Sequence, residues 1–209
     1  MVSRDTFTLG QARNMSPLPI VTEIPLFCPT GTRVLDVGVG TGRNTFFLAR
    51  YGFPVDAIDS CAQGVGEINE CAKAHALPVR AMVQDIRERD PLFRQYEIIL
   101  CTLTLHYLSP ERANLFLANA RHSATSRTIH VIGAITMDGD FSNTYSSTER
   151  YFPKRDELRR TYANEGWRIH RAYEQRLAMA QTHSDGSPML NVVSFLIAQK
   201  PYPGWERHT

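Results

Sequence analysis

Residues 33–44 read Arg-Val-Leu-Asp-Val-Gly-Val-Gly-Thr-Gly-Arg-Asn, and they decide the fold that this sequence predicts. Residues 34–37 form the short apolar run that is typical of a buried parallel strand. Gly38, Gly40 and Gly42 follow at every second position, and a residue without a Cβ atom lets a ligand lie against the backbone. The helix expected next would offer unpaired N–H groups to that ligand. We interpret the stretch as a strand, a cofactor loop and the start of a helix.

The spacing of these glycines separates two cofactor classes. A dinucleotide fingerprint, Gly-x-Gly-x-x-Gly, needs glycine at position 43, where the sequence has Arg43. This argues against a nicotinamide enzyme. Asp36, two residues before the first glycine, followed by Gly-x-Gly-x-Gly, resembles motif I of class I S-adenosylmethionine (AdoMet) methyltransferases. The alternative is an ordinary glycine-rich turn between a strand and a helix, since short glycine patterns recur by chance.

The composition bounds the class of protein. The chain has 209 residues, which fits a single domain, and its content of 43% hydrophobic and 21% charged residues is globular. A net charge of +2 without a basic block gives no case for nucleic acid or membrane binding, so we expect a small-molecule partner. No apolar run reaches the roughly 20 residues of a membrane span and no signal-type segment begins the chain, which predicts a cytoplasmic protein. The four cysteines lack metal-ligand spacing, so we expect reduced thiols and no metal site.

Two further carboxylates follow predicted strands. Asp59 ends the strand at residues 54–59 and lies 21 residues after Gly38, about where a doubly wound fold places an acid for the ribose hydroxyls. The strand at residues 78–83 runs into Asp85. Ligands of open α/β sheets bind outside the carboxyl ends of the strands, so Asp36, Asp59 and Asp85 are expected to point toward one crevice. A surface-turn aspartate remains the alternative for Asp59.

The remaining pattern completes an α/β fold. Further strands are predicted at residues 96–102, 128–135, 167–174 and 192–199, and helices at 17–27, 65–76, 111–121 and 155–164. We therefore predict a Rossmann-like, seven-stranded methyltransferase sheet, mostly parallel with an antiparallel last strand, with helices on both faces. Residues 1–209 would form one domain, with residues 1–16 as a flexible arm. Residues 137–150 would be a loop, either a lid or a linker.

Taken together, residues 31–201 resemble the tellurite-resistance TehB family of AdoMet methyltransferases. The resemblance rests on the loop with its Gly-Arg-Asn ending, on Cys101-Thr102 and the apolar residues after it, and on Glu157-Leu-Arg-Arg-x-Tyr162 with Gly166-Trp167. It implies AdoMet as cofactor. By this resemblance Gly38, Val39 and Gly40 lie under the methionine part, Arg43 and Asn44 at the helix start, Asp59 at the ribose, Asp85 and Ile86 beside the adenine, and Thr102 near the methionine amino group. Asp36, Gly42 and Ser60 complete the predicted set of cofactor-binding residues.

The acceptor is less constrained. The family pattern has Leu-His-Arg before the last strand, whereas this chain has Thr182-His183-Ser184, and Pro188 stands near a second lost arginine. The acceptor could be a tellurite or selenite oxyanion or a small organic O, N or S nucleophile, and the lost arginines argue against the oxyanion. His183 and His106 are the candidate catalytic residues, as a base or as an anion-binding group. Either could instead be a structural, hydrogen-bonded histidine.

Other functions fit the sequence less well. The segment Cys101-Thr-Leu-Thr lacks the Asn/Asp-Pro-Pro-aromatic motif of methyltransferases that act on exocyclic amines or nucleic acids, and no basic stripe accompanies it. A non-catalytic AdoMet-binding regulatory module is the alternative from another class. The sequence predicts a monomer or a homodimer without choosing between them.

Overall fold

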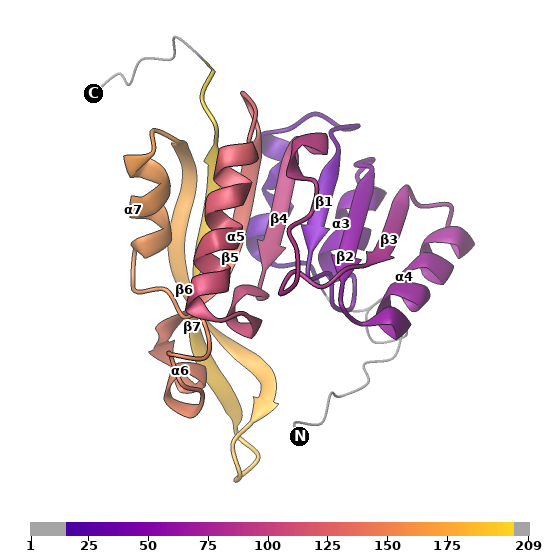
Figure 1. Ribbon diagram of the computed structural model, residues 1–209. Coiled ribbons are helices and arrows are strands. Elements are labelled where there is room, and N and C mark those ends of the chain that lie inside the picture. The colour runs from indigo at the N-terminus through magenta and orange to yellow at the C-terminus, as the bar shows by residue number, and fades with distance from the viewer. Residues whose placement is uncertain (1–15, 203–209) are drawn as a thin grey trace. The chain divides into compact units, whose positions relative to one another are not determined.

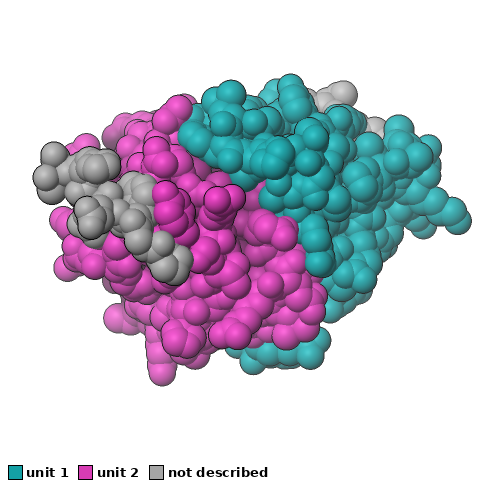
Figure 2. All heavy atoms as spheres, turned by 90° about the horizontal axis from the view of Figure 1, so that it is seen from above, with its two compact units in different colours: residues 1–89 teal, residues 90–209 magenta. Residues whose placement is uncertain are grey.

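The computed structural model describes residues 16–202 of the chain, which form two compact units, residues 1–89 and residues 90–209 (Figure 2). A seven-stranded sheet has the strand order β3-β2-β1-β4-β5-β7-β6. The seven strands, mostly parallel with one antiparallel strand, confirm the predicted fold class. The predicted arm, apart from Ser16, lies outside the described residues, and the single domain stays a prediction.

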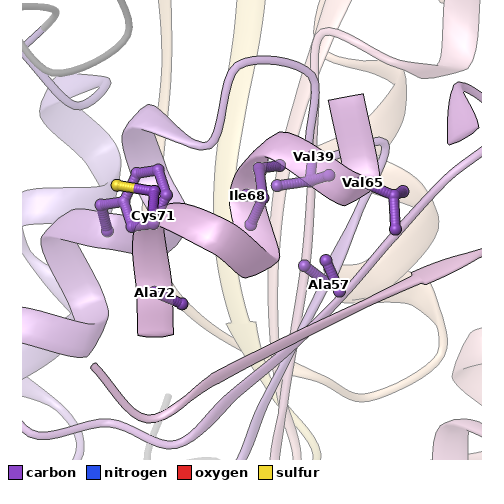
Figure 3. Close-up of a cluster of buried hydrophobic side chains, with 8 residues drawn as sticks. Val39, Ala57, Val65, Ile68, Cys71 and Ala72 are labelled. Carbon is purple, nitrogen blue, oxygen red and sulfur yellow. The ribbon is translucent and has the colours of Figure 1, made fainter. Parts of the chain in front are cut away.

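The first unit contains three parallel strands and two longer helices (Figure 1). They are β1 (Val34–Val37), α3 (Arg43–Arg50), β2 (Val55–Asp59), α4 (Ala62–Ala74) and β3 (Val79–Val83). Every residue of β1 is buried, as its apolar run predicts. Val39 of the glycine loop packs with Val65 and Ile68 of α4 and Ala57 of β2 in one apolar cluster (Figure 3). The predicted strand, loop and helix therefore share a core.

The helix predicted at residues 17–27 is wrong in detail. The segment forms α2 (Pro19–Thr22) and a 3₁₀ turn, η1 (Ile24–Leu26). Pro25 has no N–H to donate to the carbonyl four residues earlier, so a continuous α-helix would lose a bond there. The chain turns more tightly instead, with the Leu26 N–H donating to the Glu23 carbonyl at 2.9 Å.

The second unit contains the other four strands. Its elements are η2 (Phe93–Gln95), β4 (Ile98–Thr102), η3 (Leu105–Tyr107), α5 (Pro110–Ser123), β5 (Ile129–Gly139), α6 (Asp140–Thr144), α7 (Glu157–Asn164), β6 (Arg168–Thr182) and β7 (Pro188–Gln199). Strand β5 runs parallel to β4, and β7 runs antiparallel to both β5 and β6. Helix α5 begins as its sequence indicates, because the Ser109 hydroxyl accepts a hydrogen bond from the Arg112 N–H and Pro110 occupies the first position.

Three strands are longer than predicted. Strand β5 extends to Gly139, and β6 and β7 form a hairpin that runs past α6 in Figure 1. The outer part of β6 is mostly exposed, so it carries little of the alternating burial from which strands are predicted. Main-chain pairing to β7 forms it instead. Residues 137–150 are consequently no continuous loop, since they begin inside β5 and include α6.

Two further findings concern membrane-spanning helices and cysteines. Between residues 16 and 202, no helix combines the length and apolar character needed to cross a bilayer. All four cysteines are free thiols, and three of them, Cys28, Cys71 and Cys101, are buried.

Candidate functional site

The glycine loop, Gly38–Gly42, is fastened to the neighbouring strand. The N–H groups of Gly38 and Val39 both donate to the Ile58 carbonyl, at 2.8 and 3.1 Å. The Val39 side chain is buried in the apolar cluster, so it anchors the loop to the core of the first unit. The backbone of the loop is therefore held in place without a ligand.

Two glycines of the loop have different reasons to be glycine. Both have positive φ, +55° at Gly40 and +80° at Gly42, a region that residues with a Cβ atom rarely adopt. A Cβ atom on Gly42 would lie 2.8 Å from Cε2 of Phe46, so packing alone requires glycine there. A Cβ atom on Gly40 would meet no atom of the described residues within 4 Å. The space above exposed Gly40 is open, as a cofactor that lies against the backbone requires.

Asp59 faces this loop. Its two carboxylate oxygens accept hydrogen bonds from the Gly40 N–H at 3.0 Å and from the Cys61 N–H at 2.9 Å. Asp59 thus holds the loop against the end of β2, and each oxygen keeps a lone pair for a ribose hydroxyl. Ser60, next along the chain, is exposed.

Asp36 lies inside the unit instead. It is buried in β1 and accepts a hydrogen bond from Thr45 Oγ1 at 2.6 Å. Burial raises the pKa of this carboxyl to about 6, the Thr45 bond opposes the rise, Asp59 adds to it and the charge of Arg43 opposes it. The bond between Asp36 and Thr45 joins β1 to the start of α3, and this structural role is enough to explain an aspartate at this position. Whether it also orients the cofactor stays a prediction.

The other cofactor candidates of this unit have varied surroundings. Asn44 is buried and its Oδ1 accepts the Leu18 N–H at 3.0 Å, which ties α2 to α3. Asp85 follows β3 and accepts hydrogen bonds from the backbone and guanidinium of Arg87. Ile86 is buried beside it. The paired carboxylate after β3 and the apolar residue next to it fit an edge for the adenine, which stays a prediction.

Thr102 and His106 belong to the second unit. Thr102 ends β4 and is buried, and the next residue, Leu103, has a φ of +53°. His106 lies in η3, and its Nδ1 has no hydrogen-bond partner among the described residues. Burial, with a smaller effect of Arg150, lowers the pKa of His106 to about 3. A group this weakly basic is a poor proton acceptor near neutral pH, so hydrogen bonding is its better role.

His183 lies on the turn between β6 and β7, where its Nε2 is 3.0 Å from Oδ2 of Asp140. The same oxygen accepts the Leu190 N–H at 2.6 Å. That backbone bond, followed by the bond to His183, lowers the pKa of Asp140, so its ionised carboxylate can accept a hydrogen bond from Nε2. This bond engages Nε2 and not Nδ1. A histidine oriented by a carboxylate is the usual arrangement of a general base.

Sequence reasoning missed Asp140, which lies 43 residues from His183. It also missed Asn191, which is buried and whose Oδ1 accepts the Phe141 N–H at 2.9 Å. Neither belongs to a motif. Asp140 begins α6, and the pairing of β5 with β7 brings Asn191 beside it. Thr45 lies in the first turn of the helix after the glycine loop, so helical spacing could have indicated its hydroxyl as a partner of Asp36.

The chain is similar to known proteins in sequence and in fold. The family model "Tellurite resistance protein TehB" matches residues 21–195. Hemagglutinin 1 of Eikenella corrodens is 29% identical over 171 residues, 81% of this chain and 55% of that protein. The "Probable S-adenosyl-L-methionine-dependent methyltransferase TehB" of Haemophilus influenzae is 25% identical over 123 residues, 56% of this chain and 43% of that protein.

The solved structure of TehB from Haemophilus influenzae has the same fold. It superposes with a TM-score of 0.76 at 19% identity, over 91% of this chain and 65% of that one. The chain spans about half the length of the curated relatives that it matches. Because the family model covers most of the sequence, the chain belongs to the TehB family.

Proposed function

We propose that the chain transfers a methyl group from AdoMet to a small-molecule acceptor. The first unit would bind the cofactor through the glycine loop, with Asp59 at the ribose and Asp85 at the adenine edge. The second unit would bind the acceptor, with His183 as its base. The observation that carries the proposal is the open space above Gly40, next to a carboxylate that already organises the loop.

The chemistry asks little of the protein beyond positioning. AdoMet supplies an activated methyl carbon, which the acceptor's lone pair attacks while the carbon–sulfur bond breaks and its electrons go to sulfur. An acceptor that must lose a proton needs a base, and an acceptor that is already an anion does not. The free Nδ1 of His183 could take that proton, because Asp140 holds the other ring nitrogen.

The cofactor half is tested by Gly40→Val with Gly31→Val as its matched control. Both glycines have positive φ, +55° and +87°, and at both a Cβ atom would meet nothing within 4 Å. The two variants therefore share a conformational cost of about 1–2 kcal/mol or more, but only Gly40 belongs to the loop. Calorimetric titration with AdoMet should show binding abolished in folded Gly40→Val and retained in Gly31→Val.

Unchanged AdoMet affinity in folded Gly40→Val would refute the cofactor site. If AdoMet does bind, an assay for the product S-adenosylhomocysteine separates an enzyme from a module that only binds AdoMet. The acceptor can be found by screening small molecules for those that raise the melting temperature in the presence of S-adenosylhomocysteine, since a ligand of the folded state stabilises it by mass action.

A further inference from the structure

Four side chains of the second unit form a cluster that the predicted site does not include as a whole. His106, Phe141, Tyr145 and Arg150, here called the Arg150 cluster, come from η3, α6 and the segment after α6. The rings of His106 and Phe141 are 5.7 Å apart and edge to face, and those of Phe141 and Tyr145 are 5.6 Å apart in the same geometry. The Arg150 guanidinium lies 3.9 Å from the centre of the Tyr145 ring.

Polar groups in and beside this cluster lack partners. The guanidinium of half-buried Arg150 stacks on Tyr145, and in the described part of the chain it makes no hydrogen bond or ion pair. Stacking uses the face of a guanidinium and leaves its N–H edges for an anion. Two buried nitrogens beside Phe141, Nδ1 of His106 and Nδ2 of Asn191, also have no partner among the described residues. Buried polar atoms are rarely left unpaired, so these two nitrogens are candidates to bind a ligand or an ordered water.

Two carboxylates of this unit, Asp140 and Glu157, are already engaged. Asp140 accepts bonds from His183 and from the Leu190 N–H. Glu157 accepts bonds from the Tyr151 hydroxyl at 3.3 Å and the Lys154 N–H at 2.9 Å. His106 is neutral, because its pKa is lowered to about 3. The charge of the Arg150 cluster is therefore the positive charge of Arg150, whose guanidinium lies against the Tyr145 ring.

We propose that the Arg150 cluster binds the acceptor, and that the acceptor is a small organic carboxylate with an apolar body. Arg150 binds the carboxylate through two parallel N–H donors, and the rings of Phe141 and Tyr145 bound its apolar part. His106 and Asn191 hydrogen-bond to polar atoms of the same molecule. The inference rests on the proposed methyl transfer, and it chooses an organic acid over an inorganic oxyanion, which would gain nothing from aromatic neighbours.

Binding of three probes tests this proposal on the full chain with S-adenosylhomocysteine present. Benzoate has a carboxylate and an apolar body, benzyl alcohol has the body alone, and selenite is an oxyanion without the body. We expect benzoate to raise the melting temperature most and to bind detectably in calorimetry. Equal binding of benzyl alcohol would show that the carboxylate is not recognised, and binding of selenite alone would show that the apolar wall is not used. Either result overturns the proposal.

Three variants locate the carboxylate. Arg150→Gln should weaken benzoate binding about 10- to 100-fold, the usual loss when a charged hydrogen-bond partner is removed, and Arg150→Lys should weaken it less. Arg94→Gln, at an exposed arginine of η2 in the same unit, should change nothing. Unchanged binding in folded Arg150→Gln overturns the proposal. Titration with AdoMet alone keeps the two ideas apart, because loss of the cofactor site would leave benzoate binding to the Arg150 cluster intact.

Discussion

The two units build their candidate sites in opposite ways. In the first unit, the glycine loop and the carboxylate that holds it are 19 residues apart, and each follows a buried strand. In the second unit, His183 and its carboxylate are 43 residues apart, and the Arg150 cluster draws on η3 and α6. A contiguous strand, loop and strand can be recognised along the sequence. A site assembled by strand pairing cannot.

Physical constraints explain the difference. Positive φ at Gly40 and Gly42 restricts those positions to glycine, so the conformation of the loop can be recognised in the sequence. Nothing comparable restricts Asp140 or Arg150, since many sequences could follow β5 without altering the fold. Changes to His183, Asp140 or Arg150 should therefore alter acceptor chemistry and leave cofactor binding intact, and changes to the loop should do the reverse.

The largest effect should come from His183→Ala. If His183 is a base, turnover of the acceptor found by thermal screening should fall roughly 10²- to 10⁴-fold, with AdoMet affinity unaltered in calorimetry. If His183 only binds an anion, the loss should appear mainly in the acceptor KM.

Asp140→Asn distinguishes the base from a structural histidine. The amide can still accept the Leu190 N–H but holds His183 less firmly, so kcat should fall, by less than in His183→Ala. Full activity of His183→Ala would remove the residue from the mechanism.

Much of the fold could be predicted because apolar runs and glycine turns recur at intervals that a parallel sheet requires. The seven strands and the acidic residues at the ends of β2 and β3 belong to this class. The long β6–β7 hairpin could not be predicted, because main-chain hydrogen bonds form it while its side chains stay largely exposed. The role of Asp36 was equally hidden, since burial against Thr45 depends on the packing of α3 over β1.

A smaller effect is expected from Asp59→Ala. Loss of the carboxylate frees the Gly40 N–H and removes the expected ribose contact, so AdoMet binding should weaken by about 1–3 kcal/mol. Asp56→Ala, on the same strand, is the control, because the Asp56 carboxylate pairs with exposed Arg80. Calorimetry with equal affinities for Asp59→Ala and the unmodified chain would leave Asp59 as a turn residue and place the ribose contact elsewhere.

The smallest effect is on stability and concerns Asp36. This prediction tests the buried, structural part of the first unit and not its binding surface. Burial raises the pKa of this carboxyl from 3.8 to about 6, so the folded state holds a proton that the unfolded chain has lost. The resulting stability is fully present below pH 3.8 and is lost as the pH rises through 6, by about 2 kcal/mol at most between pH 4 and pH 6. Asp36→Asn cannot ionise and keeps an oxygen for the Thr45 hydroxyl, so its urea midpoint should decline less over this range. Thr45→Val removes the bond that favours the ionised form, so the decline should become steeper. Parallel midpoint curves for Asp36→Asn and the unmodified chain would show that Asp36 titrates near its ordinary pKa and that burial does not control it.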